Sequence, residues 1–182
     1  HNLGFVMPQI GYRDFYAEHS FQDLPHHEYI GLHDEDFYRA LNTKLKENSY
    51  DQFFFALNQS NHEPYIVPEK YTSLIDEIYI PEDVYKNVSL SREHTKKRFL
   101  SFYYADKVLG EFFEQSSREN YFKDTLFVLT GDHVFRGLNF TTRNVFQQAK
   151  VPFILYAPFL MKKDMIGKEI DIVSNHFDIL PT

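Results

Sequence analysis

The sequence predicts an α/β fold in which helices cover both faces of a mainly parallel or mixed sheet. Short apolar runs, typical of strands buried on both faces, alternate with longer stretches whose apolar residues recur every three or four positions, as in helices. The chain has 182 residues, of which 43% are hydrophobic. It is therefore long enough for one domain with a sizeable core and too short for two full domains.

The first third of the chain predicts one helix and one strand. Residues 1–33 contain many aromatic and histidine residues without a clear period, and predict loops and short elements. A helix is predicted from Asp34 to about Glu47, because its apolar residues share one face and its acidic start suits the positive end of the helix dipole. Gln52–Leu57 is short, apolar and bounded by polar residues, so it predicts a buried strand, and a polar loop over residues 58–65 follows.

The middle of the chain predicts a long connection and a second helix. Residues 66–90 contain Pro68 and Pro81 and predict an irregular connection, and a loop of this length inside a compact domain is usually functional. From about Ser91 to Gln115 the apolar residues follow a helical period. One row of this helix consists of Leu100, Tyr104, Val108 and Phe112.

The last third of the chain predicts further strands. Thr125–Leu129 and Val151–Tyr156 are apolar runs that predict a second and a third buried strand, although Pro152 indicates that the start of the latter is not fully paired. Glu169–Val173 is a candidate fourth strand, and residues 175–179 are expected to begin a last helix or a turn.

Composition and chain ends exclude several classes of protein. The formal charge of -7 argues against a nucleic-acid-binding surface, which would require clustered lysine and arginine. Without cysteine the chain has no disulfide and no thiolate metal site. No apolar run reaches the ~18 residues that a membrane span requires. No signal peptide is recognised at His1, and the chain stops directly after a strand-like run. We therefore expect the sequence to be a piece of a longer protein at both ends.

Two predicted strands lead into residues that can carry chemistry. Gln52–Leu57 leads to His62, and the strand ending at Leu129 leads to Asp132 and His133. These positions are informative because α/β proteins bind their ligands outside the carboxyl ends of the strands. On a tight turn begun by Gly131, a carboxylate and an imidazole can converge on one ion, and this donor pair suits Zn²⁺ or Mn²⁺. The alternative is a capping aspartate beside a half-buried histidine.

Other polar residues allow more than one interpretation. His62 can donate to an anionic oxygen or act as a general acid, or it is a loop histidine without a chemical role. His176 and Asp178 can be further ligands, can orient His133, or can cap a final helix; the structural role is favoured for Asp178. The remaining charged clusters are expected to be solvated surface. They comprise His26 and His27, Asp34–Asp36 and Lys96–Arg98.

Six groups of residues, taken in order, resemble one known family. They are Gly11–Tyr16 with Gly31–Phe37, Phe53–Tyr65, Tyr103–Phe112, Asp124–His133, Val151–Pro158 and Phe177–Thr182. Together they cover nearly the whole chain and resemble the sulfatase-like branch of the alkaline phosphatase superfamily, in particular the lipoteichoic acid synthase or phosphoglycerol transferase type. Each motif is weakly specific alone, and the six in this order are strongly specific.

The resemblance implies an alkaline phosphatase-like fold and a metal-dependent enzyme. It implies that Asp132 and His133 bind one catalytic divalent metal (Mn²⁺, Mg²⁺ or Zn²⁺), and that His62 contacts the oxyanion or leaving group of the substrate. His176 and Asp178 fall near this site and are candidates for orienting the metal ligands or for contacting substrate. The expected substrate is a phosphate or sulfate ester, on a lipid or a glycan. The Asp-His pair favours the phosphotransferase branch, because sulfatases more often have Asp-Asn there.

The resemblance also implies that part of the enzyme is missing. Family members carry a threonine or serine nucleophile and another acidic ligand far upstream, which would lie before His1. Residues 1–182 are therefore expected to be the C-terminal portion of a single catalytic domain, inactive alone and binding metal weakly or not at all, because a tight catalytic site needs at least three protein ligands. The expected partners are the substrate and the remainder of the domain, with membrane contact only through absent segments.

Two alternatives stay open. The chain could be a non-catalytic α/β binding module that keeps only the scaffold, or part of a true sulfatase that hydrolyses sulfate esters. The resemblance further implies a location in the cell envelope, at the outer face of the cytoplasmic membrane or in the periplasm.

Overall fold

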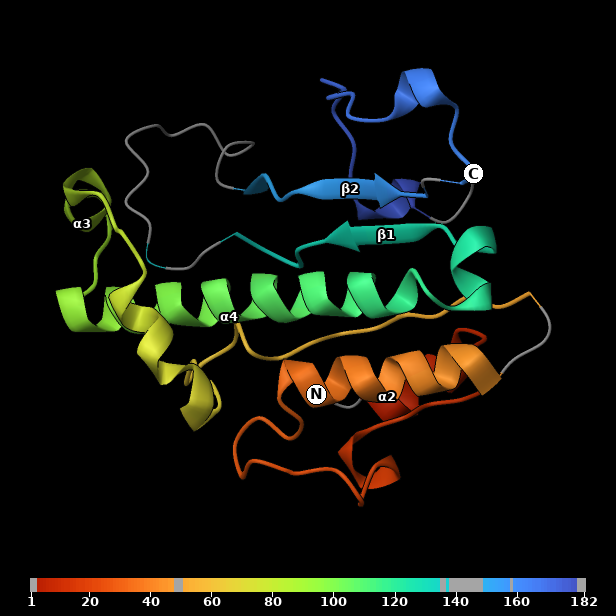
Figure 1. Ribbon diagram of the computed structural model, residues 1–182, viewed down its shortest axis with the longest axis horizontal. Coiled ribbons are helices and arrows are strands. Elements are labelled where there is room, and N and C mark those ends of the chain that lie inside the picture. Colours follow the sequence, from red (N-terminus) through yellow and green to blue (C-terminus); the bar gives the residue numbers. More distant parts are fainter. Residues whose placement is uncertain (1–2, 48–50, 135–136, 138–148, 158, 180–182) are drawn as a thin grey trace.

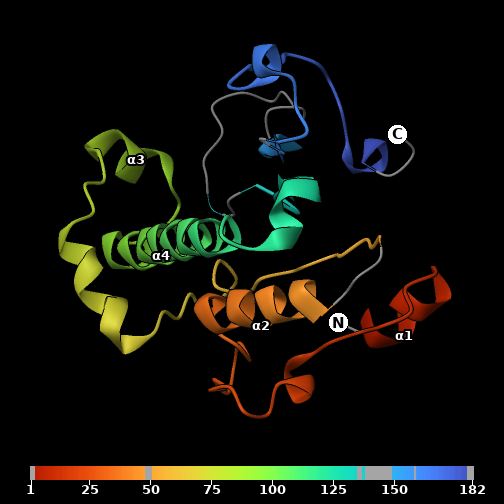
Figure 2. The ribbon, with the colours of Figure 1, turned by 45° about the vertical axis from the view of Figure 1, so that its right-hand side comes forward.

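The computed structural model describes residues 3–47, 51–134, 137, 149–157 and 159–179. Its elements are α1 (Leu3–Gln9), η1 (Glu18–Ser20), α2 (Asp34–Glu47), η2 (Glu69–Asp76), α3 (Glu82–Asn87), α4 (Arg92–Ser116), η3 (Asn120–Asp124), β1 (Phe127–Thr130), β2 (Phe153–Tyr156), η4 (Lys163–Met165) and η5 (His176–Asp178). The two long helices, α2 and α4, lie side by side, and the sheet lies on the opposite side of α4 from α2 (Figures 1 and 2).

Both long helices confirm the sequence predictions. The helix α2 has the predicted bounds, with acidic residues in its first turn and lysines in its last, as the helix dipole favours. The helix α4 begins where the Ser91 side chain accepts a hydrogen bond from the backbone N–H of His94. All four members of its predicted apolar row are buried, and each such side chain contributes roughly 1.5–3 kcal/mol of transfer free energy.

An aromatic cluster joins the sheet to α4. The ring of Phe127 on β1 lies 5.1 Å from that of Phe113 on α4, measured between centroids, and Tyr156 on β2 lies 4.9 Å from the same phenylalanine. Phe122 of η3 packs against Phe127 at 5.6 Å and is itself buried. Edge-to-face contacts of this kind fix the sheet on one side of the helix.

The predicted strands at Thr125–Leu129 and Val151–Tyr156 are confirmed, but their predicted burial on both faces is wrong. The strands β1 and β2 pair antiparallel, with Phe127 opposite Tyr156 and Thr130 opposite Phe153. Residues of β1 alternate between half-buried and exposed, and all of β2 is exposed. The described sheet therefore contains one antiparallel pair, which a mixed sheet allows.

Two other predicted strands are wrong. Gln52–Leu57 runs extended alongside α2 without a strand partner, and Phe53 and Phe55 are 57% and 55% exposed (Figures 1 and 2). Glu169–Val173 likewise forms no strand. An apolar run becomes a strand only when neighbouring backbone satisfies its N–H and C=O groups, and no such neighbour lies among the described residues.

The predicted irregular connection over residues 66–90 is partly wrong, because it contains η2 and α3. Its two prolines mark the starts of these elements: Pro68 precedes η2 and Pro81 precedes α3, each with the φ of about -60° that proline imposes. The predicted final turn over residues 175–179 is confirmed by η5. In the part of the chain that the structure describes, no helix is both long and apolar enough to cross a membrane.

Candidate active site

The loop that carries His62 is held by a buried carboxylate. Asp34, at the start of α2, is completely buried and accepts hydrogen bonds from the Asn58 side chain at 2.7 Å and from the backbone N–H groups of Ser60 at 3.1 Å and Gln59 at 3.3 Å. These donors and the positive end of α2 compensate the desolvation of the charge. The prediction that Asp34–Asp36 is solvated surface is therefore wrong for Asp34 and for Asp36, which is also buried.

The helix α4 holds the same loop from the other side. The hydroxyl of Ser101, which is completely buried, donates to the backbone carbonyl of Ser60. One turn earlier, the guanidinium of Arg98 donates to the Glu63 carboxylate at 2.9 Å. Arg98 is only 8% exposed, so the predicted solvated position of this residue is wrong as well. The loop is thus fixed at points on both sides of His62.

The imidazole of His62 is exposed and has a defined tautomer. Its Nδ1 lies 2.8 Å from the backbone oxygen of Glu63. Because a carbonyl oxygen only accepts, Nδ1 carries a proton and donates it. The neutral ring therefore presents an unprotonated Nε2, which can accept a proton, and the charged ring presents an Nε2–H, which can donate to an anionic oxygen.

Asp132 and His133 lie together directly beyond the end of β1. The Nε2 of His133 is 3.8 Å from Oδ2 of Asp132, and both side chains are substantially exposed. The other ring nitrogen, Nδ1, donates to the backbone oxygen of Val134 at 2.7 Å, which leaves Nε2 unprotonated in the neutral ring. A hydrogen bond of this kind orients a metal-binding histidine.

This pair fits a divalent ion as a partial donor set. Two donors that each bind one tetrahedral ion at about 2.1 Å lie roughly 3.4 Å apart, so the observed 3.8 Å needs only a small adjustment. Among the described residues, no group of three or more His, Cys, Asp or Glu side chains gathers around a possible ion. Beyond β1 the described residues therefore offer two candidate donors, fewer than the three or more protein ligands that a tight site uses.

His176 and Asp178 have structural contacts. The Nε2 of His176 lies 2.9 Å from the backbone oxygen of Gly131 and therefore donates to it, so this nitrogen supports the residue before Asp132 and is not available to an ion. Asp178 accepts a hydrogen bond at 2.7 Å from the backbone N–H of Asn175, which in turn caps η5. The contact of Asp178 is a capping contact, as favoured from the sequence, whereas His176 contacts Gly131 and not His133.

A groove of about 290 Å³ adjoins the His62 loop and the first turns of α4. Its lining carries two cationic side chains, one carboxylate and one histidine. The lining residues are Glu63, Pro64, Tyr65, His94, Lys97 and Arg98. The groove therefore lies on the side of the loop that follows His62.

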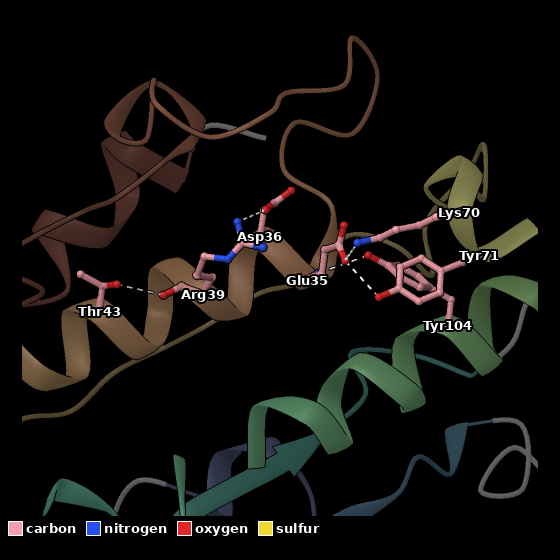
Figure 3. A network of polar contacts seen from close by, with 7 residues as sticks. All are labelled: Glu35, Asp36, Arg39, Thr43, Lys70, Tyr71 and Tyr104. Atoms are coloured by element: carbon pink, nitrogen blue, oxygen red, sulfur yellow. Dashed lines mark hydrogen bonds and ion pairs between the residues drawn. The ribbon is translucent and has the colours of Figure 1, made fainter. Parts of the chain in front are cut away.

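A second polar network fixes η2 against the two long helices (Figure 3). The carboxylate of Glu35 accepts from the hydroxyl of Tyr71 at 3.0 Å and pairs with the ammonium of Lys70 at 2.7 Å. The backbone N–H of Glu35 donates to the hydroxyl of Tyr104 at 3.2 Å. Burial, followed by the bond to Glu35, raises the pKa of Tyr71 to about 12, and burial raises the pKa of Tyr104.

Sequence reasoning missed Asp34, Arg98 and Ser101. The available signal lay in α4, where the row of buried residues continues towards the N-terminus as polar side chains. This row comprises Thr95, Arg98, Ser101, Ala105, Val108 and Phe112. Polar residues at core spacing indicate a buried polar partner, which here is the His62 loop.

Comparisons with known proteins identify the family and the fold of the chain. The family model described as "Sulfatase" matches residues 2–182. A crystal structure of a protein in the alkaline phosphatase superfamily from Vibrio parahaemolyticus is 22% identical, with a TM-score of 0.56 over 81% of this chain and 33% of that chain. The likeness confirms an alkaline phosphatase-like α/β fold, and the chain corresponds to about a third of that protein's length.

Proposed function

Because the chain belongs to the sulfatase family, we propose that it forms part of a metal-dependent enzyme that cleaves or transfers phosphate esters of the phosphoglycerol type. Domains of this family are typically enzymes and generally use a divalent metal. The observation that carries the proposal is the pair beyond β1, where Asp132 Oδ2 and His133 Nε2 lie 3.8 Å apart. The corresponding alternative is hydrolysis of sulfate esters.

Each candidate residue has a role that its contacts support. Asp132 and His133 would hold one Mn²⁺, Mg²⁺ or Zn²⁺, and a bound ion would polarise the ester oxygen and lower the pKa of a coordinated hydroxyl. His62 stabilises, through its Nε2, the negative charge that develops on the transferred group or its leaving oxygen. The hydrogen bond from Nδ1 to the Glu63 carbonyl makes Nε2 the ring nitrogen that gains or loses a proton. His176 keeps Gly131 in place and thereby orients the ligand pair.

The nucleophile belongs to the remainder of the catalytic domain, which is the expected partner of residues 1–182. A hydroxyl there attacks phosphorus, a covalent intermediate forms as the first alcohol leaves, and water or a second alcohol releases it. Water gives hydrolysis, and a lipid or glycan alcohol gives transfer. We further propose that the reaction takes place in the cell envelope, at the outer face of the cytoplasmic membrane or in the periplasm.

Exposed apolar surface supports a missing part of the domain. Large apolar side chains are exposed along the extended segment Gln52–Leu57 and on β2. They include Phe53, Phe55, Leu57, Phe153, Ile154 and Leu155. Large exposed apolar patches on soluble proteins often mark surfaces that another part of the protein covers. Among the described residues, Gln52–Leu57 has no strand partner and β1 pairs only with β2, so both are open to additional strands.

The full-length protein tests the proposal. We would assay bis(p-nitrophenyl) phosphate, phosphatidylglycerol vesicles and p-nitrophenyl sulfate, with Mn²⁺, Mg²⁺ and Zn²⁺ added in turn after chelation. We expect metal-dependent turnover of the phosphate esters that His62→Ala lowers by roughly 100-fold or more, in the range for one charge-stabilising donor. His19→Ala, an exposed histidine of η1, is the control and should keep its rate.

The other outcomes separate the alternatives. Faster turnover of the sulfate ester would replace the phosphate-ester proposal with a true sulfatase. No turnover of either ester with any of the three metals would overturn the enzyme proposal in favour of a binding module.

A further inference from the structure

A single buried arginine contacts the loop that carries His62. Arg98 belongs to the basic run Lys96–Arg98, but its neighbours at 96 and 97 are exposed whereas Arg98 itself is only 8% exposed. Burial of a guanidinium is unfavourable by several kcal/mol unless its charge and donors are matched. The contacts that compensate this burial therefore show what the residue holds in place.

On one side, Arg98 contacts two residues that follow His62. Its Nη2 donates to the Glu63 carboxylate at 2.9 Å, and its guanidinium lies 4.5 Å from the centre of the Tyr65 ring. Tyr65 has a φ of 58°, in the left-handed region that bulky residues rarely adopt. Such a backbone is strained and persists only when its surroundings fix it. The stacked guanidinium and the bond from Tyr65 N–H to the His62 carbonyl, at 2.9 Å, do so here.

On its other side, Arg98 lies near Gly137. A Cβ placed on Gly137 would lie 3.4 Å from the Leu90 side chain and 3.6 Å from Nη1 of Arg98. Gly137 has a φ of 100°, and its carbonyl accepts from the N–H of Ser89 at 2.8 Å. The guanidinium is therefore enclosed on this side by Gly137, which is itself bonded to the residues just before α4.

We propose that Arg98 is a positioning residue that fixes the place and orientation of the His62 imidazole in the candidate site. The path is short: Arg98 fixes the side chain of Glu63, and the backbone oxygen of the same Glu63 accepts the Nδ1–H of His62. Arg98 acts through this loop and need not touch substrate. The expected effect of Arg98 on kcat rests on the proposed function. The expected effect of Arg98 on the His62 ring rests only on the described contacts.

The kinetic test uses a double-mutant cycle in the full-length protein. We expect Arg98→Lys to lower kcat for bis(p-nitrophenyl) phosphate by roughly 10- to 100-fold, because lysine keeps the charge but loses the stacking and the planar donor geometry, and a misplacement of about 1 Å can have this effect. In a His62→Ala background the same change should have an effect of less than about threefold, since the residue that Arg98 positions is gone. Lys96→Ala, an exposed lysine of the same helical turn that does not line the groove, is the matched control and should stay within about twofold.

A second readout does not require activity. The imidazole ¹⁵N and ¹³C resonances of His62 report whether Nδ1 carries the proton, and Arg98→Lys should shift them towards the mixed tautomers of a free histidine, whereas Lys96→Ala should not. Altered resonances in a protein without turnover would support the positioning role and reject the proposed function. Unchanged resonances, or an equal loss of kcat with and without His62, would overturn the positioning role while leaving the enzyme proposal intact. Arg98→Lys rather than Arg98→Ala is used because it keeps the buried charge and the fold.

Discussion

The buried carboxylate of Asp34 accepts a hydrogen bond at 3.1 Å from the backbone N–H of Ser60, two positions before His62. This bond joins the first turn of one long helix to the loop that carries the candidate catalytic histidine. The same bond therefore stabilises the fold and positions the His62 loop.

Replacement of Asp34 by asparagine should destabilise the protein. The carboxylate accepts hydrogen bonds from three donors, whereas the NH₂ group of asparagine cannot accept any. At least one buried donor therefore loses its partner, and each lost partner destabilises the fold by about 1–3 kcal/mol. The free energy of unfolding, measured by urea denaturation, should fall by that amount. Asp83→Asn, an exposed acidic residue in the first turn of α3, is the matched control. Equal losses for the two variants would contradict the role of Asp34.

Replacement of either member of the ligand pair should weaken metal binding in the full-length protein. Asp132→Ala and His133→Ala each remove one of the two donors beyond β1, and we expect at least a 10-fold loss of Mn²⁺ affinity by calorimetry. Asp106→Asn, an exposed acidic residue of α4, should bind Mn²⁺ normally. Wild-type affinity in both ligand variants would place the metal elsewhere.

Residues 1–182 alone should bind Mn²⁺ more weakly than micromolar and should not turn over a phosphodiester. Two protein donors leave most of the coordination sphere to water, and the proposed nucleophile belongs to another part of the domain. Titration calorimetry and the bis(p-nitrophenyl) phosphate assay measure the two properties. Micromolar binding together with turnover would show that these residues form a complete site.

The Tyr71–Glu35 bond should make the fold sensitive to alkali. The pKa of Tyr71 is raised to about 12 in the folded protein, first by burial and then by Glu35. A raised folded pKa means that the stabilisation is fully present below the unfolded value of about 10 and is lost as the pH rises from about 10 to about 12. Tyr71→Phe should flatten the fall of the urea midpoint over this range. Tyr79→Phe, at a residue that is 85% exposed, should leave the profile unchanged.

His33 should make the fold sensitive to mild acid. Its Nδ1 is buried without a hydrogen-bond partner among the described residues, and burial, followed by the charge of His27, lowers its pKa. A lowered folded pKa means that stability is present above about pH 6.5 and is lost as the pH falls from there through the folded value. His33→Gln should reduce the slope of unfolding free energy between about pH 7 and pH 5, relative to His19→Gln. An unchanged slope would show that His33 titrates alike in both states.

Much of the helical structure was predictable because its signals are local. The acidic start of α2, the Ser91 cap of α4 and the apolar row from Leu100 to Phe112 all act within a few residues of one another. The apolar run Gln52–Leu57 carried an equally clear pattern, yet it forms no strand in the described structure. A strand needs a neighbour, and a single run of sequence does not contain one.

The candidate site, like the fold, was only partly predictable from the sequence. The sequence by itself determined that Asp132 and His133 follow an apolar strand and that His62 lies in a polar loop, since these are facts of order along the chain. Only the tertiary structure decided that Asp34 and Arg98 are buried against that loop, where runs of charge predicted solvent. The physical reason is distance: the bonds from Asp34 to Ser60 and from Arg98 to Glu63 join residues 26 and 35 positions apart, and burial of a charge depends on partners that only folding brings together.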